Sequence, residues 1–259
     1  MTKMQTVAGT PAADFSFFPD PARAIALDGA MHDALAESLR HLAEHLSPEE
    51  ATGPDHVAGL IEGGARLRPT AFGHYFELAF ALLHEDAATA TTSATALTAE
   101  RPAPKGLRIG HMGGGEEDAL YLRRLGGSNF DFLPPEPEMA AAFEERFAAG
   151  RALLSAEVPE LAGEIDAIVR EVRLATGDPE APMQFDGGSA YQLWGLLLLN
   201  PRFHPDPLAV AEVLAHEAGH LLLFGFTIDE PLARNPDEDL FPSPLRVDPR
   251  PMDGIYHAT

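Results

Sequence analysis

Residues 207–226 read PLAVAEVLAHEAGHLLLFGF, a segment with strong helical signals at both ends. Asp206 stands before it as a predicted N-cap, and Pro207 occupies the first helical position. Inside the segment only Gly219 disfavours a helix, and Gly225 stands where a C-capping glycine is common. Apolar side chains cover much of the circumference, so we expect a largely buried helix.

The same segment contains an HExxH pattern formed by His216, Glu217 and His220. Histidines four residues apart lie one above the other on a helix, so both imidazoles can reach one cation. The glutamate beside the first histidine can reach a water on that metal. The alternative is a helix with two surface histidines, but a buried helix retains such polar side chains only where they have partners. We therefore predict His216 and His220 as metal ligands and Glu217 as a catalytic residue.

The composition narrows the possible partners and cofactors. The chain has 259 residues, 18 Lys plus Arg against 40 Asp plus Glu, and a formal net charge of −22. Such a surface repels phosphate groups, which argues against binding to nucleic acid or to an anionic membrane. Cysteine is absent, so disulfides, cysteine-bound zinc, iron–sulfur clusters and thiol catalysis are excluded. Any metal must use histidines and carboxylates.

Apolar runs in this sequence are short. The longest are residues 193–199 and 221–226, far below the roughly 20 residues that cross a bilayer. The polar start lacks the order of a signal peptide, so we expect a cytoplasmic protein without a membrane anchor. The sequence leaves the oligomeric state open.

The rest of the chain is predominantly helical, with a few strand candidates. We expect an N-terminal helical region over residues 1–86, a flexible Ala/Thr/Pro linker or loop over 87–105, and a catalytic metal-binding region over 106–259, with one continuous domain as the alternative. The fold class is α+β, with a small sheet packed against the metal helix. Helices are expected over 22–46, 69–86, 116–125, 137–156 and 159–168, and strands over 170–175, 191–199 and possibly 183–185. On the first of these helices, His32, His41 and His45 are expected to face solvent or to cap neighbours.

The third metal ligand decides the chemistry, and several residues are candidates for it. The long metzincin pattern is excluded, because Leu223 and Phe226 stand where it needs glycine and histidine. Glu238 lies at a workable distance for a thermolysin-like site, but its Pro-rich surroundings disfavour the helix that such a site needs. The remaining candidate is His257. A three-histidine site suits zinc hydrolysis and equally suits iron(II) with a chelating cosubstrate and dioxygen.

Two arginines lie between the metal helix and His257. Arg246 and Arg250 stand in a segment whose prolines constrain the backbone. An arginine can hold the distal carboxylate of 2-oxoglutarate through two parallel hydrogen bonds. The alternative for each arginine is a salt bridge to a neighbouring carboxylate.

Three blocks in the last third of the chain resemble a known family. They are residues 185–200 (FDGGS running into LWGLLLLN), residues 216–231 (HEAGH running into FGFTIDEP) and residues 243–257 (SPLRVDPRPMDGIYH). In this order they resemble the HExxH-motif peptide-modifying proteins encoded beside ribosomally made, post-translationally modified peptides. The resemblance covers residues 159 to the end; the family's chain continues past the position of His257, whereas two residues follow it here.

That resemblance implies an iron(II)- and 2-oxoglutarate-dependent peptide β-hydroxylase, with dioxygen as co-reactant and a precursor peptide as substrate. It implies His216, His220 and His257 as iron ligands. Arg246 and Arg250, with Ser243 nearby, would bind 2-oxoglutarate, and Glu217 would orient a ligand or a metal-bound water.

Two other functions remain open from the sequence. One is a zinc(II) metallopeptidase with Glu217 as general base and a carboxylate such as Glu238 as third ligand. The other is a catalytically idle peptide-binding scaffold that keeps the helix without a complete site. Trp194 and Tyr191 are expected to pack in the core, although an edge strand there could pair with an extended peptide.

Overall fold

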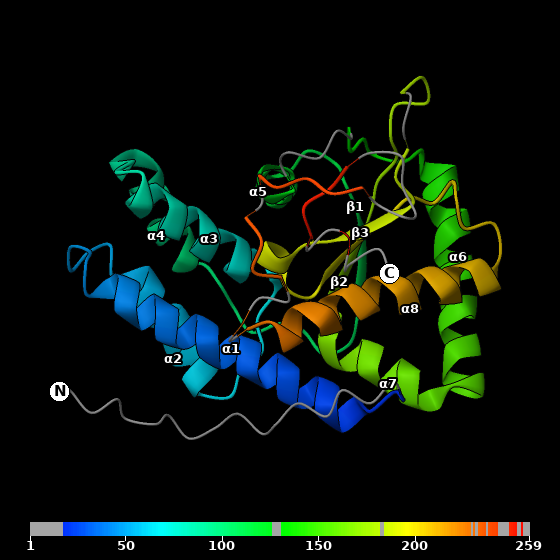
Figure 1. The fold of residues 1–259 in the computed structure, drawn as a ribbon, viewed down its shortest axis with the longest axis horizontal. Helices are drawn as coiled ribbons and strands as arrows, with labels where there is room; N and C mark the ends of the chain where they lie inside the picture. Colours follow the sequence, from blue (N-terminus) through cyan, green and yellow to red (C-terminus); the bar gives the residue numbers. More distant parts are fainter. Residues whose placement is uncertain are drawn as a thin grey trace.

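The computed structural model describes residues 18–125, 131–181, 184–228, 230, 233–236, 238–242, 249–252 and 255. These residues form eight α-helices, one short 3₁₀ helix and a four-stranded mixed sheet (Figure 1). The expected α+β class with a predominance of helix is therefore confirmed.

Four helices precede the sheet. They are α1 (Pro21–Ala43), α2 (Thr52–Glu62), α3 (Pro69–Leu83) and α4 (Ala87–Leu97). The sequence analysis predicted α1 and α3 and did not predict α2.

Helix α4 corrects the expectation of a flexible linker at residues 87–105. The Asp86 carboxylate accepts a hydrogen bond from the Thr89 backbone and caps the helix. Its small side chains allow close packing, since a Cβ atom added at Gly53 of α2 would lie 1.9 Å from the Ala94 carbonyl oxygen. A loop is expected where large apolar residues are absent, but here small residues such as Gly53 and Ala94 let the backbones of α2 and α4 approach each other closely.

One apolar core extends from the N-terminal helices to the helix that carries the HExxH residues. Its members include Leu39 of α1, Leu97 of α4, Val172 in the sheet and Leu214 in the last helix. His32, which we expected near solvent, is fully buried in this core. Its Nδ1 atom donates to the Asp28 carbonyl at 2.7 Å, and its Nε2 atom accepts from the Leu67 amide at 3.0 Å. Because the core is continuous across residues 87–105, the helices before and after that segment are packed together.

The sheet has the order β1-β2-β4-β3. Strands β1 (Arg108–His111), β2 (Glu171–Leu174) and β4 (Leu196–Leu199) are parallel, and β3 (Gly187–Ser189) pairs antiparallel with β4 at the edge. The predicted strand over 170–175 is confirmed. The one over 191–199 is right only in its second half, because residues Tyr191–Leu193 form the 3₁₀ helix η1.

The prediction of a possible strand over residues 183–185 is wrong for the residues that the structure describes there, 184 and 185. Residue 183 lies outside the described residues, and Phe185 is buried next to Met112 and Leu198 rather than paired in the sheet. Strand pairing begins at Gly187, where the chain runs beside the edge of β4.

The remaining helices surround the sheet. They are α5 (Glu116–Arg124), α6 (Pro137–Glu157), α7 (Pro159–Ile168) and α8 (Pro207–Phe226), which follows β4 and packs on α6, α7, α1 and β3 (Figure 1). Asp206 caps α8 as predicted, accepting from the Ala209 amide at 2.9 Å. Gly225 is not the C-cap: the helix continues through it to Phe226, and Gly225 packs closely against Leu27 and Trp194.

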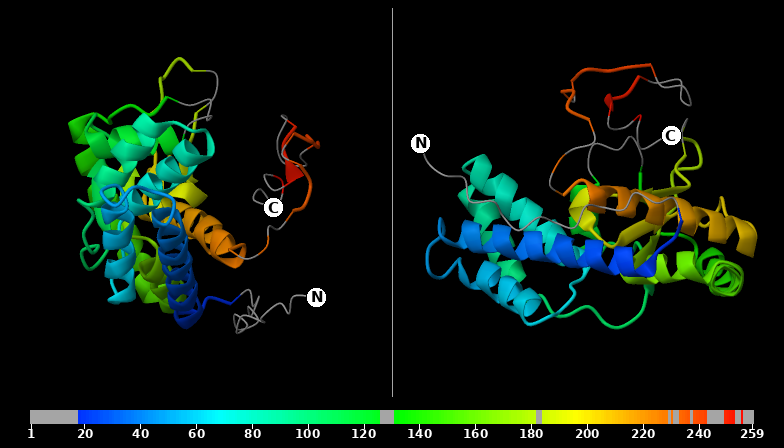
Figure 2. Two further views of the ribbon diagram at one scale, coloured as in Figure 1. Left: turned by 90° about the vertical axis from the view of Figure 1, so that its left-hand side faces the viewer. Right: turned by 60° about the horizontal axis from the view of Figure 1, so that its bottom comes forward.

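Among the described residues only α8 is long and apolar enough to be a candidate membrane span. It packs on α6, α7, α1 and β3; Glu217 is on its buried side, whereas His216 is exposed and His220 is half-buried. The described parts of residues 233–252 lie apart from the body formed by α1–α7 (Figure 2).

Candidate metal centre

His216 and His220 lie side by side on α8. Their Nε2 atoms are 3.1 Å apart, and their ring planes are nearly perpendicular, with centroids 4.7 Å apart. The His216 side chain is 65% exposed, so the pair opens toward solvent on one side. Two nitrogens at this separation can both contact one cation at the usual metal–nitrogen distance of about 2.0–2.1 Å. The predicted juxtaposition of the two histidines is therefore confirmed.

Glu217 lies beside His216, on the buried side of α8. Its side chain is only 6% exposed, and its Oε1 atom lies 4.0 Å from His216 Nε2. The carboxyl group lies against β3, where a Cβ atom added at Gly187 would be 2.7 Å from Oε1. Only a glycine leaves room for the carboxyl group at this place. One ligand atom from each of His216, Glu217 and His220 lies within 4.8 Å of the others, which makes them a possible metal-binding group.

The environment of Glu217 favours its neutral form. Burial, followed by the negative charge of Asp186, raises the pKa of Glu217 to about 7, although the Ser189 hydroxyl opposes this shift. The Oε2 atom is buried and has no hydrogen-bond partner among the described residues. A carboxyl group with a pKa near neutrality, beside two imidazoles, is suited to giving and taking a proton.

The position of β3 depends on contacts with the turn after β4. The carbonyl of Asp186 accepts two hydrogen bonds, from the Asn200 amide at 2.8 Å and from His204 Nε2 at 3.0 Å. The Asn200 side chain donates to the Phe185 carbonyl at 2.9 Å. These bonds hold the start of β3 to the turn after β4, and β3 in turn packs on α8, so that Asp186 and Ser189 are near Glu217.

The sequence analysis assigned no role to Asp186 or Ser189. Both belong to the FDGGS block on which the family resemblance rests, and that block was the only signal that could have identified them. Their contribution depends on a contact between residues about 30 positions apart, which helical or strand periodicity does not reveal.

Most of the other predicted site residues lie outside the described part of the chain. Ser243, Arg246 and His257 belong to this group. Arg250 is described: it forms an antiparallel bridge with Phe241, with backbone hydrogen bonds of 2.8 and 3.0 Å. This bridge holds together the two ends of the segment in which Ser243 and Arg246 occur.

The carboxylate alternative for the third ligand gains no support from the described residues. Glu238 is exposed and does not belong to the metal-binding group. Glu230 forms an ion pair with Arg234 and does not belong to this group either. Within the described ranges, Glu217 is the only acidic residue grouped with the two histidines.

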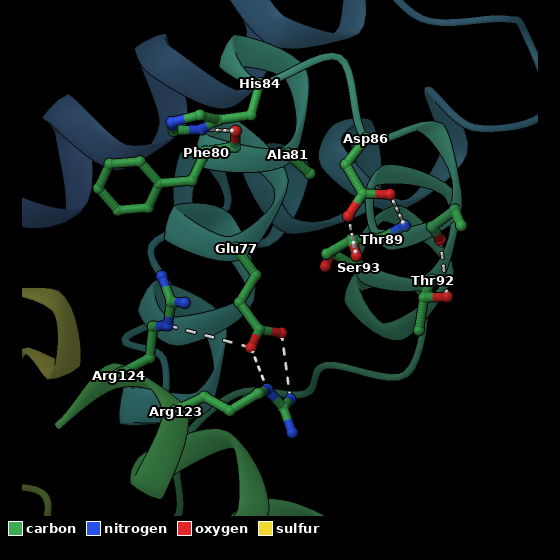
Figure 3. Close-up of a pocket in the computed structure, with 11 residues that line it drawn as sticks. Glu77, Phe80, Ala81, His84, Asp86, Thr89, Thr92, Ser93, Arg123 and Arg124 are labelled. Carbon is green, nitrogen blue, oxygen red and sulfur yellow. Dashed lines mark hydrogen bonds and ion pairs between the residues drawn. The ribbon is translucent and has the colours of Figure 1, made fainter. Parts of the chain in front are cut away.

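A separate cavity of about 600 Å³ lies among α3, α4 and α5. Figure 3 shows that Arg123 and Arg124 both point toward Glu77 in its wall. Although burial opposes ionisation, the nearby His74 side chain and the hydrogen bonds from Arg123 lower the pKa of Glu77 to about 2. Since these charges pair with one another and no HExxH residue lines the cavity, the metal centre on α8 is the stronger candidate for catalysis.

Comparison with known proteins does not add to this description. No protein-family model matches the chain, and no curated protein matches it.

Proposed function

We propose that this chain is an iron(II)- and 2-oxoglutarate-dependent hydroxylase that modifies a ribosomally synthesised peptide in the cytoplasm. The main support is the pair of adjacent imidazoles of His216 and His220, open to solvent on one side and backed by a buried carboxyl group. Bound iron(II) would couple the oxidative decarboxylation of 2-oxoglutarate by dioxygen to hydroxylation of a peptide C–H bond, releasing succinate and carbon dioxide. His257 is the proposed third ligand.

The proposed roles of the surrounding residues follow from their chemistry. Arg246 and Arg250 are proposed to bind the distal carboxylate of 2-oxoglutarate, with Ser243 beside them. Glu217, whose pKa of about 7 lets its carboxyl group hold a proton near neutral pH, is proposed to orient a ligand or a metal-bound water.

An extended peptide suits the edge of the sheet. Strand β3 pairs with β4 on one side, and no described residue pairs with its other side. An exposed strand edge can add a further strand through main-chain hydrogen bonds. Because β3 packs on α8 beside Glu217, a peptide bound there would run next to the metal centre. The net charge of −22 favours peptides with basic residues.

Metal and cosubstrate titration tests this proposal. We expect anaerobic addition of iron(II) and then 2-oxoglutarate to produce a visible charge-transfer band, and His220→Ala to abolish it. With peptide and air, succinate should form together with a peptide that has gained one oxygen atom. The absence of both the band and succinate would refute the hydroxylase.

A zinc peptidase is the second candidate, and one observation favours it. Glu217 has a pKa of about 7 and lies 4.0 Å from His216 Nε2, which suits a general base that activates water. Glu217→Gln separates the two functions. It should reduce peptide hydrolysis to background, because the base is lost. Hydroxylation requires Glu217 only as an orienting group, so it should fall by about 10- to 100-fold and remain measurable. Fragments of the peptide formed with zinc(II) alone would support the peptidase.

The third possibility, a catalytically idle peptide-binding scaffold, is tested by measuring the metal content of the purified protein. Substoichiometric zinc and iron after reconstitution, with peptide binding retained, would favour a binding module over either enzyme.

A further inference from the structure

A small apolar groove lies between α1, α3 and η1. Its volume is about 140 Å³. Pockets for drug-sized ligands occupy about 300–1,000 Å³, whereas an apolar cavity of about 150 Å³ accepts a benzene ring. The groove therefore has the size of one aromatic side chain. The side chains that line it include Met31, Leu35, Ser38, Phe72, Tyr75, Phe76 and Tyr191.

A row of aromatic rings connects this groove to the metal centre. Phe224 lies four residues after His220, so the two side chains share one face of α8. The Phe224 ring is 5.9 Å from the Tyr191 ring, and Tyr191 is 5.8 Å from Phe76. In Figure 1, α3, the turn that contains η1 and α8 follow one another across the molecule.

This row of aromatic rings includes Tyr191, which lies just after the end of the edge strand β3. Tyr191 is two residues after Ser189, the last residue of β3, and its side chain is 37% exposed. A peptide that extends β3 and continues in the same direction would therefore reach Tyr191 and the groove behind it. The ring-to-ring steps and one helical turn span at most roughly 18 Å, which an extended chain covers in about three to five residues.

We propose that the groove binds an aromatic side chain of the peptide substrate, three to five residues from the modified position. This inference rests on the proposed function for the nature of the substrate. The groove would supply specificity through burial of the ring and contacts with Tyr75, Phe76 and Tyr191. Strand pairing with β3 is insensitive to side-chain identity and would supply the rest of the binding.

Peptide binding to the full chain without added metal tests the groove. The probes are two fluorescein-labelled peptides of about 12 residues with lysines at both ends, identical except for one central Phe or Ser. Burial of a Phe side chain predicts at least about tenfold tighter binding of the Phe peptide by fluorescence anisotropy. Ser38→Trp, which fills the groove, should remove this preference. Thr95→Trp, on the exposed face of α4, is the matched control and should keep it.

Cross-linking to the unmodified protein avoids reliance on a variant that fails to fold. With benzoylphenylalanine in place of Phe, we expect cross-links to Met31, Tyr75 or Tyr191. Equal binding of both peptides, no binding of either, or cross-links confined to other surfaces would overturn the proposal. So would a concentration-dependent dimer that Ser38→Trp dissociates, because a second copy would then occupy the groove.

The two proposals can fail separately. A preference for Phe without hydroxylation would leave the groove assignment intact and end the proposed hydroxylase. Hydroxylation of the Phe and Ser peptides with equal kcat/KM would end the groove assignment and leave the enzyme.

Discussion

Gly187→Ala should reduce activity without disturbing the fold or the metal. The new Cβ atom would lie 2.7 Å from Glu217 Oε1 and 3.1 Å from its Cγ and Cδ atoms. To restore an ordinary contact the carboxyl end must move by at least about 0.7 Å. Because the clash involves the end of a flexible side chain, the variant folds and the displacement falls on Glu217.

The expected effect on turnover is large for so small a change. A displacement of about 1 Å in a catalytic group costs up to about 100-fold in rate, so we expect a 10- to 100-fold loss of peptide-dependent activity. The affinity for metal should change less than threefold, since the atoms nearest to the new methyl group belong to Glu217 and not to His216 or His220.

The assay compares Gly187→Ala with Gly188→Ala. A Cβ atom at Gly188 meets no atom within 4 Å among the described residues, so this control should retain activity. Circular dichroism and metal titration would establish that both variants fold and bind metal. Wild-type turnover in Gly187→Ala, or an equal loss in Gly188→Ala, would refute the assignment of Glu217 as a positioned functional group.

Three further predictions concern stability. Asp28→Ala should lower the free energy of unfolding by about 3–5 kcal/mol in urea, because it leaves the buried Trp194 indole N–H and the partly buried Arg66 and Arg170 without their carboxylate partner; a loss below 1 kcal/mol would contradict this. Gly53→Ala should cost about 1–3 kcal/mol, since its Cβ would clash with the Ala94 carbonyl, and an unchanged Tm would show that α2 and α4 can separate freely. The free energy of unfolding of the metal-free wild type should fall as the pH rises from 5 to 8, because the raised pKa of Glu217 makes the folded state hold a proton that the unfolded chain releases. In Glu217→Gln this fall should be smaller by up to roughly 3 kcal/mol. Equal pH dependence of the two proteins would contradict the prediction.

Local signals identified most helices correctly. Helix α7 has the predicted bounds because Pro159 favours a helical start and its apolar residues repeat at helical spacing. The Asp206 cap and the HExxH spacing likewise act within one helix, and they place His216 beside His220 without reference to the rest of the chain.

Elements whose stability comes from distant partners were missed. Helix α4 lacks large apolar residues and is stabilised by close packing on α2 and α3. Strand β3 consists of Gly187, Gly188 and Ser189, which have little intrinsic tendency to form a strand. It exists because β4 offers an edge and because Asn200 and His204 hold the preceding residue.

The amino-acid sequence by itself determined the helix with the HExxH pattern, its paired histidines and the absence of cysteine. Each of these depends on composition or on residues within one or two helical turns. Only the tertiary structure decided that Glu217 is buried, that Gly187 makes room for it, and that Asp186 and Ser189 adjust its pKa. These features arise from contacts between α8 and β3, and the pKa of a carboxyl group is determined by burial and neighbouring charge rather than by its position in the chain.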